Sequence, residues 1–157
     1  MNPDETERPA PSDPIPADAG VSYLGVYVGP ELYGVPLMRL REVARLTRLR
    51  RVPGVAANVA GLVNLRGEIV CALDAHGILG LPRASGTTPG YLLALHDFGF
   101  PVGLVVDAIG DIFRVDPNVL DDVPSSWRAE RMACLTGVCR VQESVAGLLD
   151  LDRVVRR

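Results

Sequence analysis

The chain is divided into short apolar or alternating runs, each closed by Gly, Pro or Asp, and this spacing restricts the possible folds more than any other feature. Runs of this length and pattern are typical of β-strands. We predict ten strands, at residues 22–28, 32–37, 46–52, 59–65, 68–73, 91–95, 100–106, 111–115, 135–141 and 144–149. Short helical turns are expected at 39–45, at 76–79 before Gly80, and at 150–155. The fold class is therefore all-β with short helices.

The predicted strands form two groups on either side of a glycine-rich segment, residues 82–90. Five strands precede it and five follow it, which predicts two small closed β units. Neither unit is large enough to bury a full core, so we expect the two to cover one another. The clearest hairpin joins 59–65 to 68–73 through Arg66-Gly67, where glycine supplies the positive φ that a two-residue turn demands.

Residues 1–20 differ from the rest of the chain in composition. They hold five prolines and five acidic residues against Arg8 alone, a net charge of −4. Because apolar periodicity is also missing, we predict a disordered, acidic, Pro-rich tail ahead of one folded domain at 21–157. This start is unlike a secretory signal, and no stretch approaches the roughly 18 apolar residues of a membrane helix. We therefore expect a soluble, cytoplasmic protein.

The residue types that carry catalysis are sparse. All sixteen basic residues are arginine, which excludes Schiff-base catalysis and lysine-based phosphate loops. His76 and His96 are twenty residues apart, and Cys71, Cys134 and Cys139 do not form a C-x-x-C motif. We therefore expect a protein that is not an enzyme and that uses no cofactor or metal. A thiol enzyme built on Cys71 and His76 is an open alternative.

Basic residues gather in one place. Arg39, Arg41, Arg45, Arg48, Arg50 and Arg51 stand against Glu42 alone, a charge of +5 within thirteen residues. Three interpretations are open: a solvated face, a contact with an acidic protein surface, or an arginine-led nucleic-acid-binding β-barrel. The last is disfavoured because residues 21–157 carry fifteen arginines against fourteen acidic residues, and aromatic residues are few.

Four motifs carry a resemblance to a known family. Residues 61–70 (GLVNLRGEIV), followed by Asp74, resemble the hairpin motif of the CheW family, the coupling proteins of bacterial chemotaxis arrays. Residues 40–43 (LREV), 102–112 (VGLVVDAIGDI) and 148–155 (LLDLDRVV) resemble three further elements of that family. Together the motifs span roughly residues 23–155, with spacing similar to the family's throughout.

The resemblance implies a fold and a function. Members of this family have two five-stranded SH3-like β-barrels around a shared apolar core and no catalytic activity. They act as adaptors that bind the regulatory domain of a CheA-type histidine kinase and the cytoplasmic tip of chemoreceptors. The same parts serve chemotaxis, gliding, pilus motility and developmental pathways. A fragment of the kinase itself is a further alternative, because its regulatory domain shares the architecture.

The resemblance also implies two sets of site residues. The receptor-binding set, matched position by position, is Leu40, Glu42, Val43, Gly61, Asn64 and Arg66. The kinase-binding set is Leu49, Arg50 and Val52. Several of these residues have a structural alternative: backbone geometry for Gly61, bonding to the turn for Asn64, support of the backbone for Arg66, and strand packing for the kinase set.

Two positions depart from the family pattern. Cys71 stands where proline is usual, and Ala75-His76 stand where Leu-Arg is usual. The second change removes a positive charge near the end of the hairpin, which puts the partner contacts at that end in question.

Overall fold

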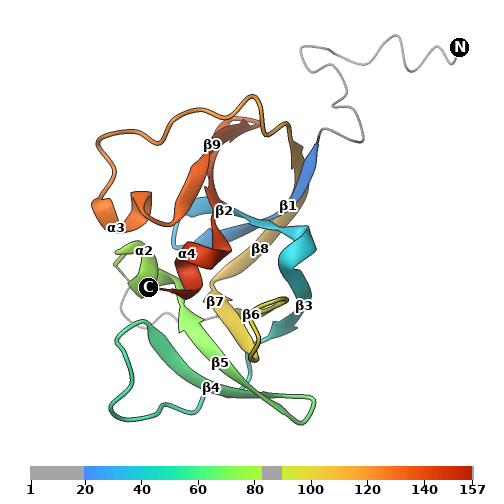
Figure 1. The fold of residues 1–157 in the computed structure, drawn as a ribbon, viewed down its shortest axis with the longest axis vertical. Coiled ribbons are helices and arrows are strands. Elements are labelled where there is room, and N and C mark those ends of the chain that lie inside the picture. Colours follow the sequence, from blue (N-terminus) through green and yellow to red (C-terminus); the bar gives the residue numbers. More distant parts are fainter. Residues whose placement is uncertain (1–19, 83–89, 157) are drawn as a thin grey trace, which may run out of the picture.

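The computed structural model describes residues 20–82 and 90–156, which form two five-stranded sheets, one above the other (Figure 1). The first sheet, in the order β8-β1-β2-β10-β9, comprises β1 (Val21–Val28), β2 (Glu31–Pro36), β8 (Ala108–Val115), β9 (Leu135–Val141) and β10 (Ser144–Leu149). The second sheet, in the order β3-β6-β7-β5-β4, comprises β3 (Leu40–Arg45), β4 (Val59–Leu65), β5 (Glu68–Asp74), β6 (Tyr91–Leu95) and β7 (Val102–Val106). The short helices are η1 (Leu37–Arg39), α2 (Ala75–Leu79), α3 (Ala129–Met132) and α4 (Leu151–Val155). None of the helices in these residues has the length and apolar character needed to cross a bilayer.

The two sheets share one pairing pattern. In the first, β2 of the hairpin β1–β2 pairs in parallel with β10, and β10 pairs antiparallel with β9. In the second, β7 of the hairpin β6–β7 pairs in parallel with β5, and β5 pairs antiparallel with β4. An edge strand, β8 or β3, completes each sheet on its other side. The predicted pair of five-stranded units is therefore confirmed.

The predicted division of the chain between these units is wrong. The first sheet takes β1 and β2 from the start of the chain and β8, β9 and β10 from its end, whereas the second takes the five strands between them. The chain therefore crosses between sheets at η1 and again at Asp107, between β7 and β8. The glycine-rich segment 82–90, expected to separate the two units, falls in the chain between two strands of the second sheet, β5 and β6, and its residues 83–89 lie outside the described residues.

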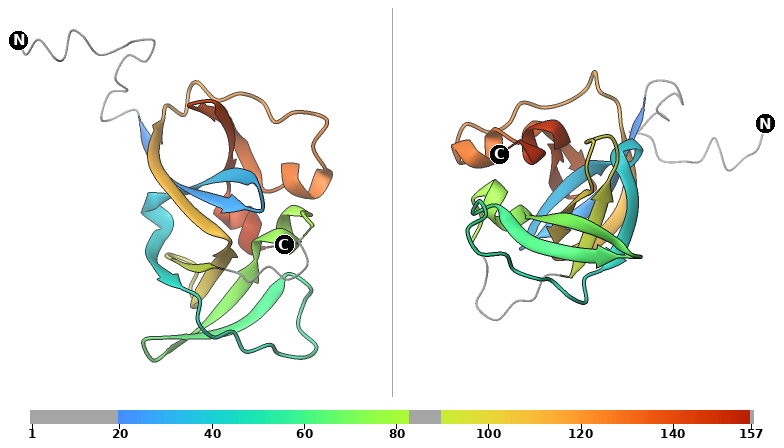
Figure 2. Two further views of the ribbon diagram at one scale, coloured as in Figure 1. Left: turned by 180° about the vertical axis from the view of Figure 1, so that it is seen from behind. Right: turned by 60° about the horizontal axis from the view of Figure 1, so that its bottom comes forward.

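A single apolar core joins the two units, as predicted. It contains Val26 and Tyr33 from the first sheet and Leu93 and Leu104 from the second, with Leu151 of α4 beside them. Two smaller clusters belong to one sheet each, around Leu148 in the first and Val70 in the second. Figures 1 and 2 show the sheets meeting at this level, with the three α-helices around the junction.

Most local predictions are confirmed, and two are wrong. Residues 39–45, expected as a helical turn, include strand β3, in which half-buried and exposed residues alternate and which pairs with β6. Residues 46–52, expected as a strand, form only an isolated bridge from Arg50 to Leu62. Helix α2 is as expected: the Asp74 side chain accepts a hydrogen bond from the His76 amide, and Gly80 ends the helix at φ +68°. Helix α3 was not foreseen.

Both crossings between the sheets carry polar contacts. At the first, the Arg39 guanidinium contacts the Asp152 carboxylate of α4 at 3.2 Å and lies 4.5 Å from the centre of the Phe98 ring. At the second, Asp107 Oδ2 accepts a hydrogen bond from the Gly29 amide at 2.6 Å and lies 2.6 Å from His76 Nε2. The two units are therefore fixed to one another at two separated points as well as by their core.

Candidate protein-docking surface

The hairpin that carries the N-L-R-G motif ends in a tight turn. Arg66 and Gly67 both have positive φ, +53° and +87°, and Leu65 pairs directly with Glu68. This is the geometry of a type I′ turn, which asparagine and glycine favour and arginine does not. The Gly67 amide donates a hydrogen bond of 2.9 Å to Asn64 Oδ1, so Asn64 holds the turn. The structural interpretation of Asn64 is therefore supported.

Two ion pairs connect β3 to this hairpin. Arg66 contacts Glu42 at 3.3 Å, and Arg41 contacts Glu68 at 2.7 Å. Because β3 lies at one edge of the second sheet and the β4–β5 hairpin at the other side, these pairs join β3 to the turn end of the hairpin. The Arg66 side chain remains 81% exposed, whereas that of Glu42 is 24% exposed. Three residues of the predicted receptor set, Glu42, Asn64 and Arg66, thus meet at one end of the unit.

The remaining members of that set have different roles. Val43 is 39% exposed on the outward side of β3, so it is available to a partner. Leu40 is half-buried and packs against the shared core. We define the hairpin surface as six exposed or half-buried residues of this region, among them Ile69, which is 54% exposed and was not in the predicted receptor set: Arg41, Glu42, Val43, Arg66, Glu68 and Ile69.

Gly61 is required by a close approach of two backbones. A Cβ atom at this position would collide with the carbonyl group of Arg50. At the same place the amides and carbonyls of Arg50 and Leu62 exchange hydrogen bonds of 2.9 and 2.8 Å. The structural interpretation of Gly61 is therefore supported, and its function is to let residues around Arg50 cross the outer edge of β4.

The predicted kinase set lies on this crossing segment. Leu49 is half-buried and packs, with Leu46, against the smaller core of the second sheet. Arg50 is exposed and Val52 is half-buried. The backbone of the segment is thus anchored on the sheet while the side chain of Arg50 remains accessible.

The geometry does not make Cys71 and His76 the reactive pair that the thiol-enzyme alternative needs. His76 is buried, and its ring nitrogens lie 2.6 Å from Asp107 Oδ2 and 3.2 Å from the Pro82 carbonyl oxygen. Both nitrogens are therefore engaged, and neither serves Cys71 as a base. Cys134 and Cys139 are buried, whereas Cys71 is half-buried. Burial raises the pKa of the Cys139 thiol, and the negative charge of Asp121 raises it further. Both effects keep the thiol protonated.

The departure at His76 has a structural explanation. The side chain lies in the junction between the two units rather than on the exposed hairpin surface. Its partner Asp107 belongs to the residue 102–112 motif, so the two motifs meet in space. No local pattern indicates this contact, because the two residues are 31 positions apart in the sequence.

A groove that the motifs did not indicate lies in the first sheet. Its volume is about 490 Å³, and its walls come from four separate segments, around Tyr27, Leu32, Phe113 and Gln142. None of the predicted site residues lines it. Only the strand order brings these segments together, so no local pattern could have predicted the groove.

Comparisons with known proteins agree with the fold and the motifs. Residues 22–157 match the family model described as the CheW-like domain. The chemotaxis protein CheW of Rhizobium meliloti is 27% identical over 137 residues, covering 87% of this chain and 88% of that protein. Protein PilI of Pseudomonas aeruginosa is 26% identical over 101 residues, covering 64% of this chain and 55% of that protein. The crystal structure of the scaffolding protein TtCheW from Thermoanaerobacter tengcongensis superposes with a TM-score of 0.71 at 20% identity, covering 83% of this chain and 88% of that one, which shows the same fold. The chain therefore belongs to the CheW-like domain family.

Proposed function

We propose that this chain is a non-enzymatic adaptor of a cytoplasmic chemosensory array, where it joins a CheA-type histidine kinase to the tip of a chemoreceptor. Membership of the CheW-like domain family supports this function. The firm connection between the two units supports it as well, because an adaptor must hold two partners in one geometry for a signal to pass between them. The nucleic-acid alternative is not favoured.

The hairpin surface is the proposed receptor contact. The observation that carries this assignment is Arg66, whose guanidinium is exposed at the end of a tight turn and contacts only the half-buried Glu42 among the described residues. An arginine is unfavourable at a positive φ, so its presence is better explained by what its side chain binds than by the turn. Glu42 orients it, Val43 provides exposed apolar area, and Leu40, Gly61 and Asn64 support the backbone.

The anchored segment with Leu49, Arg50 and Val52 is the proposed kinase contact. It lies beside β4 in the same unit, but it contacts the sheet through different residues from those of the hairpin surface. Two partners can therefore bind without sharing side chains.

A substitution at Arg66 tests the receptor contact. Arg66→Asn removes the charge and creates the Asn-Gly pair that type I′ turns favour, so the free energy of unfolding is expected to stay equal or to increase slightly. Loss of a charge-assisted interface bond is expected to weaken binding of a receptor cytoplasmic fragment by about 1.5–3 kcal/mol, roughly tenfold to a hundredfold.

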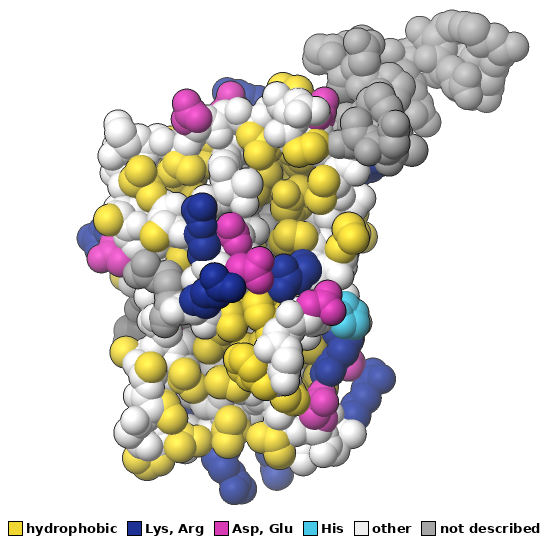
Figure 3. Space-filling view, viewed as in Figure 1, with side chains coloured by type: hydrophobic (Ala, Val, Ile, Leu, Met, Phe, Trp, Pro, Cys, Tyr) yellow, Lys and Arg dark blue, Asp and Glu magenta, His cyan; other side chains and the backbone are white. Residues whose placement is uncertain are grey.

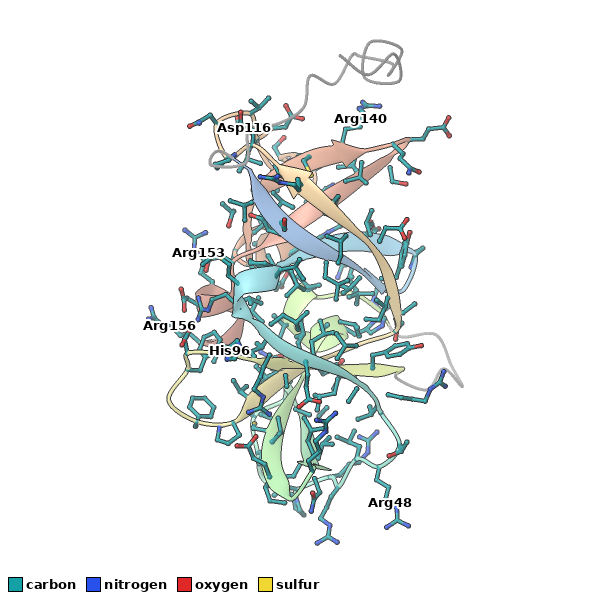
Figure 4. The ribbon with its side chains drawn as sticks, turned by 90° about the vertical axis from the view of Figure 1, so that its right-hand side faces the viewer. Arg48, His96, Asp116, Arg140, Arg153 and Arg156 are labelled. Atoms are coloured by element: carbon teal, nitrogen blue, oxygen red, sulfur yellow. The ribbon has the colours of Figure 1, made fainter. Side chains whose placement is uncertain are left out.

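The matched control is Arg140→Asn, an exposed arginine at the far end of the first sheet (Figure 4). It is expected to leave receptor and kinase affinities unchanged. If Arg66→Asn binds the receptor fragment as tightly as the control variant does, the receptor assignment of the hairpin surface is wrong.

A further inference from the structure

The six arginines between residues 39 and 51 divide into two groups with different surroundings. Arg39 and Arg41 form ion pairs with Asp152 and Glu68. Arg45 lies 5.7 Å from the centre of the Tyr91 ring. Four of the six arginines are exposed and form no ion pair within residues 20–82 and 90–156. We name these four the arginine segment: Arg45, Arg48, Arg50 and Arg51. The positive charge that the sequence shows as one cluster is therefore neutralised at one end only.

The backbone that carries the arginine segment is held in place. The Leu46 amide donates a hydrogen bond of 3.0 Å to the Gly90 carbonyl, and Arg50 exchanges two with Leu62. Leu46 and Leu49 fix the side facing the sheet by packing against its core. The backbone that carries the arginines is thus anchored, which lowers the entropic cost of binding a partner.

The uncompensated charge lies at one end of the molecule. Arg48 projects into solvent at the lower end, and Arg140 lies at the opposite end (Figure 4). In the space-filling view, basic and acidic side chains are adjacent across the middle of the face, whereas basic side chains at the lower end have no acidic neighbours (Figure 3). Four like charges within seven residues repel one another, and carboxylates of a partner would relieve this repulsion.

We propose, on the basis of the proposed kinase contact, that the arginine segment docks on a carboxylate-rich protein surface of the kinase. Arg48 and Arg51 are then contact residues in addition to Leu49, Arg50 and Val52. The guanidinium group favours this partner, because its planar donors pair with carboxylates in a bidentate manner. A single-stranded nucleic acid would instead require aromatic side chains for stacking, and the only aromatic ring that contacts the arginine segment in the described residues is that of Tyr91.

The test is the affinity of the full chain for the full-length CheA-type kinase of the same organism, measured at two salt concentrations. The double variant Arg48→Glu with Arg51→Glu is compared with a control double variant, Arg128→Glu with Arg140→Glu. The control arginines are also exposed and form no ion pair in the part of the chain that the structure describes. Melting temperatures of both variants confirm that each is folded.

We expect the Arg48/Arg51 variant to bind the kinase at least about tenfold more weakly than the control at about 50 mM NaCl, with most of the difference gone at about 500 mM, because salt screens exposed charges. Equal affinities of the two variants would overturn the inference while leaving the kinase contact itself intact. A wild-type chain that does not bind the kinase at all would overturn both the inference and the proposed function.

Two further arms identify the source of the negative charge. The first probe is a 20-nucleotide single-stranded DNA. If the DNA binds more tightly than the kinase and the Arg48/Arg51 variant loses that binding, the partner is a nucleic acid and the inference is wrong.

The second experiment uses a full-length chain in which Asp4, Glu5, Glu7, Asp13 and Asp18 are replaced by their amides. We expect the same loss on reversing Arg48 and Arg51 in this background. If the loss disappears there, the carboxylates belong to this chain's own N-terminal residues and not to the kinase.

Discussion

Asn64 and Arg66 have separate functions at the β4–β5 turn. Asn64 accepts the Gly67 amide hydrogen bond, and Arg66 extends away from the backbone to Glu42 and solvent. One residue therefore determines the shape of the turn, whereas the other determines what the turn offers to a partner.

Asn64→Ala is expected to destabilise the fold, because it leaves the Gly67 amide without its partner in a strained turn. The expected loss in the free energy of unfolding is about 0.5–1.5 kcal/mol. Urea unfolding of Asn64→Ala and Arg66→Asn side by side measures it. A stability of Asn64→Ala equal to that of wild type would contradict the structural function of this residue.

Among the individual elements, β3 and the segment after it best illustrate what the sequence could predict. The hairpin turn and the end of α2 at Gly80 depend on local glycine signals and were predicted correctly. Strand β3 was not, because Leu40, Val43 and Ala44 have the spacing of a helical turn. Its half-buried positions include a charged residue, Glu42, whose ion pair with Arg66 is invisible in the sequence. The parallel pairing of β2 with β10 likewise joins distant segments without a local pattern.

The first crossing element, η1, provides a pH-dependent contact. The hydrogen bond from Arg39 is the main cause that lowers the pKa of Asp152 below its ordinary value. A lowered pKa in the folded state means that the contact contributes stability above the unfolded pKa of about 3.9 and loses it as the pH falls through the folded value.

Comparison of the wild type with Asp152→Asn measures this effect. The melting temperature of the wild type is expected to exceed that of the variant at about pH 7, by a small amount because the carboxylate is exposed, and to approach it at about pH 2. A difference that stays constant over this range would show that the charge of Asp152 does not contribute.

For the whole molecule, the main consequence of the topology is that neither half of the chain contains all five strands of either sheet. The first sheet needs β1 and β2 together with β8, β9 and β10, and the second is closed only when β6 and β7 join β3, β4 and β5. The shared core adds a further dependence between the halves.

We therefore expect that neither residues 1–86 nor residues 87–157 fold alone, whereas the two mixed together regain the native spectrum. Each half holds only about 70 to 90 residues and exposes apolar strand faces that the other half covers. Amide NMR spectra of the separate and mixed halves provide the measurement. A dispersed spectrum from either half alone would contradict the interdependence of the two units.

Co-sedimentation of the full-length kinase with receptor-containing membranes tests the adaptor function most directly. The kinase is mixed with membranes alone, with membranes and the wild-type chain, and with membranes and the Arg66→Asn or Arg140→Asn variant. We expect the kinase to sediment with the membranes when the wild-type or Arg140→Asn chain is present, and much less with Arg66→Asn or without the chain. Equal sedimentation of the kinase with and without the chain would contradict the claim that this protein couples the two.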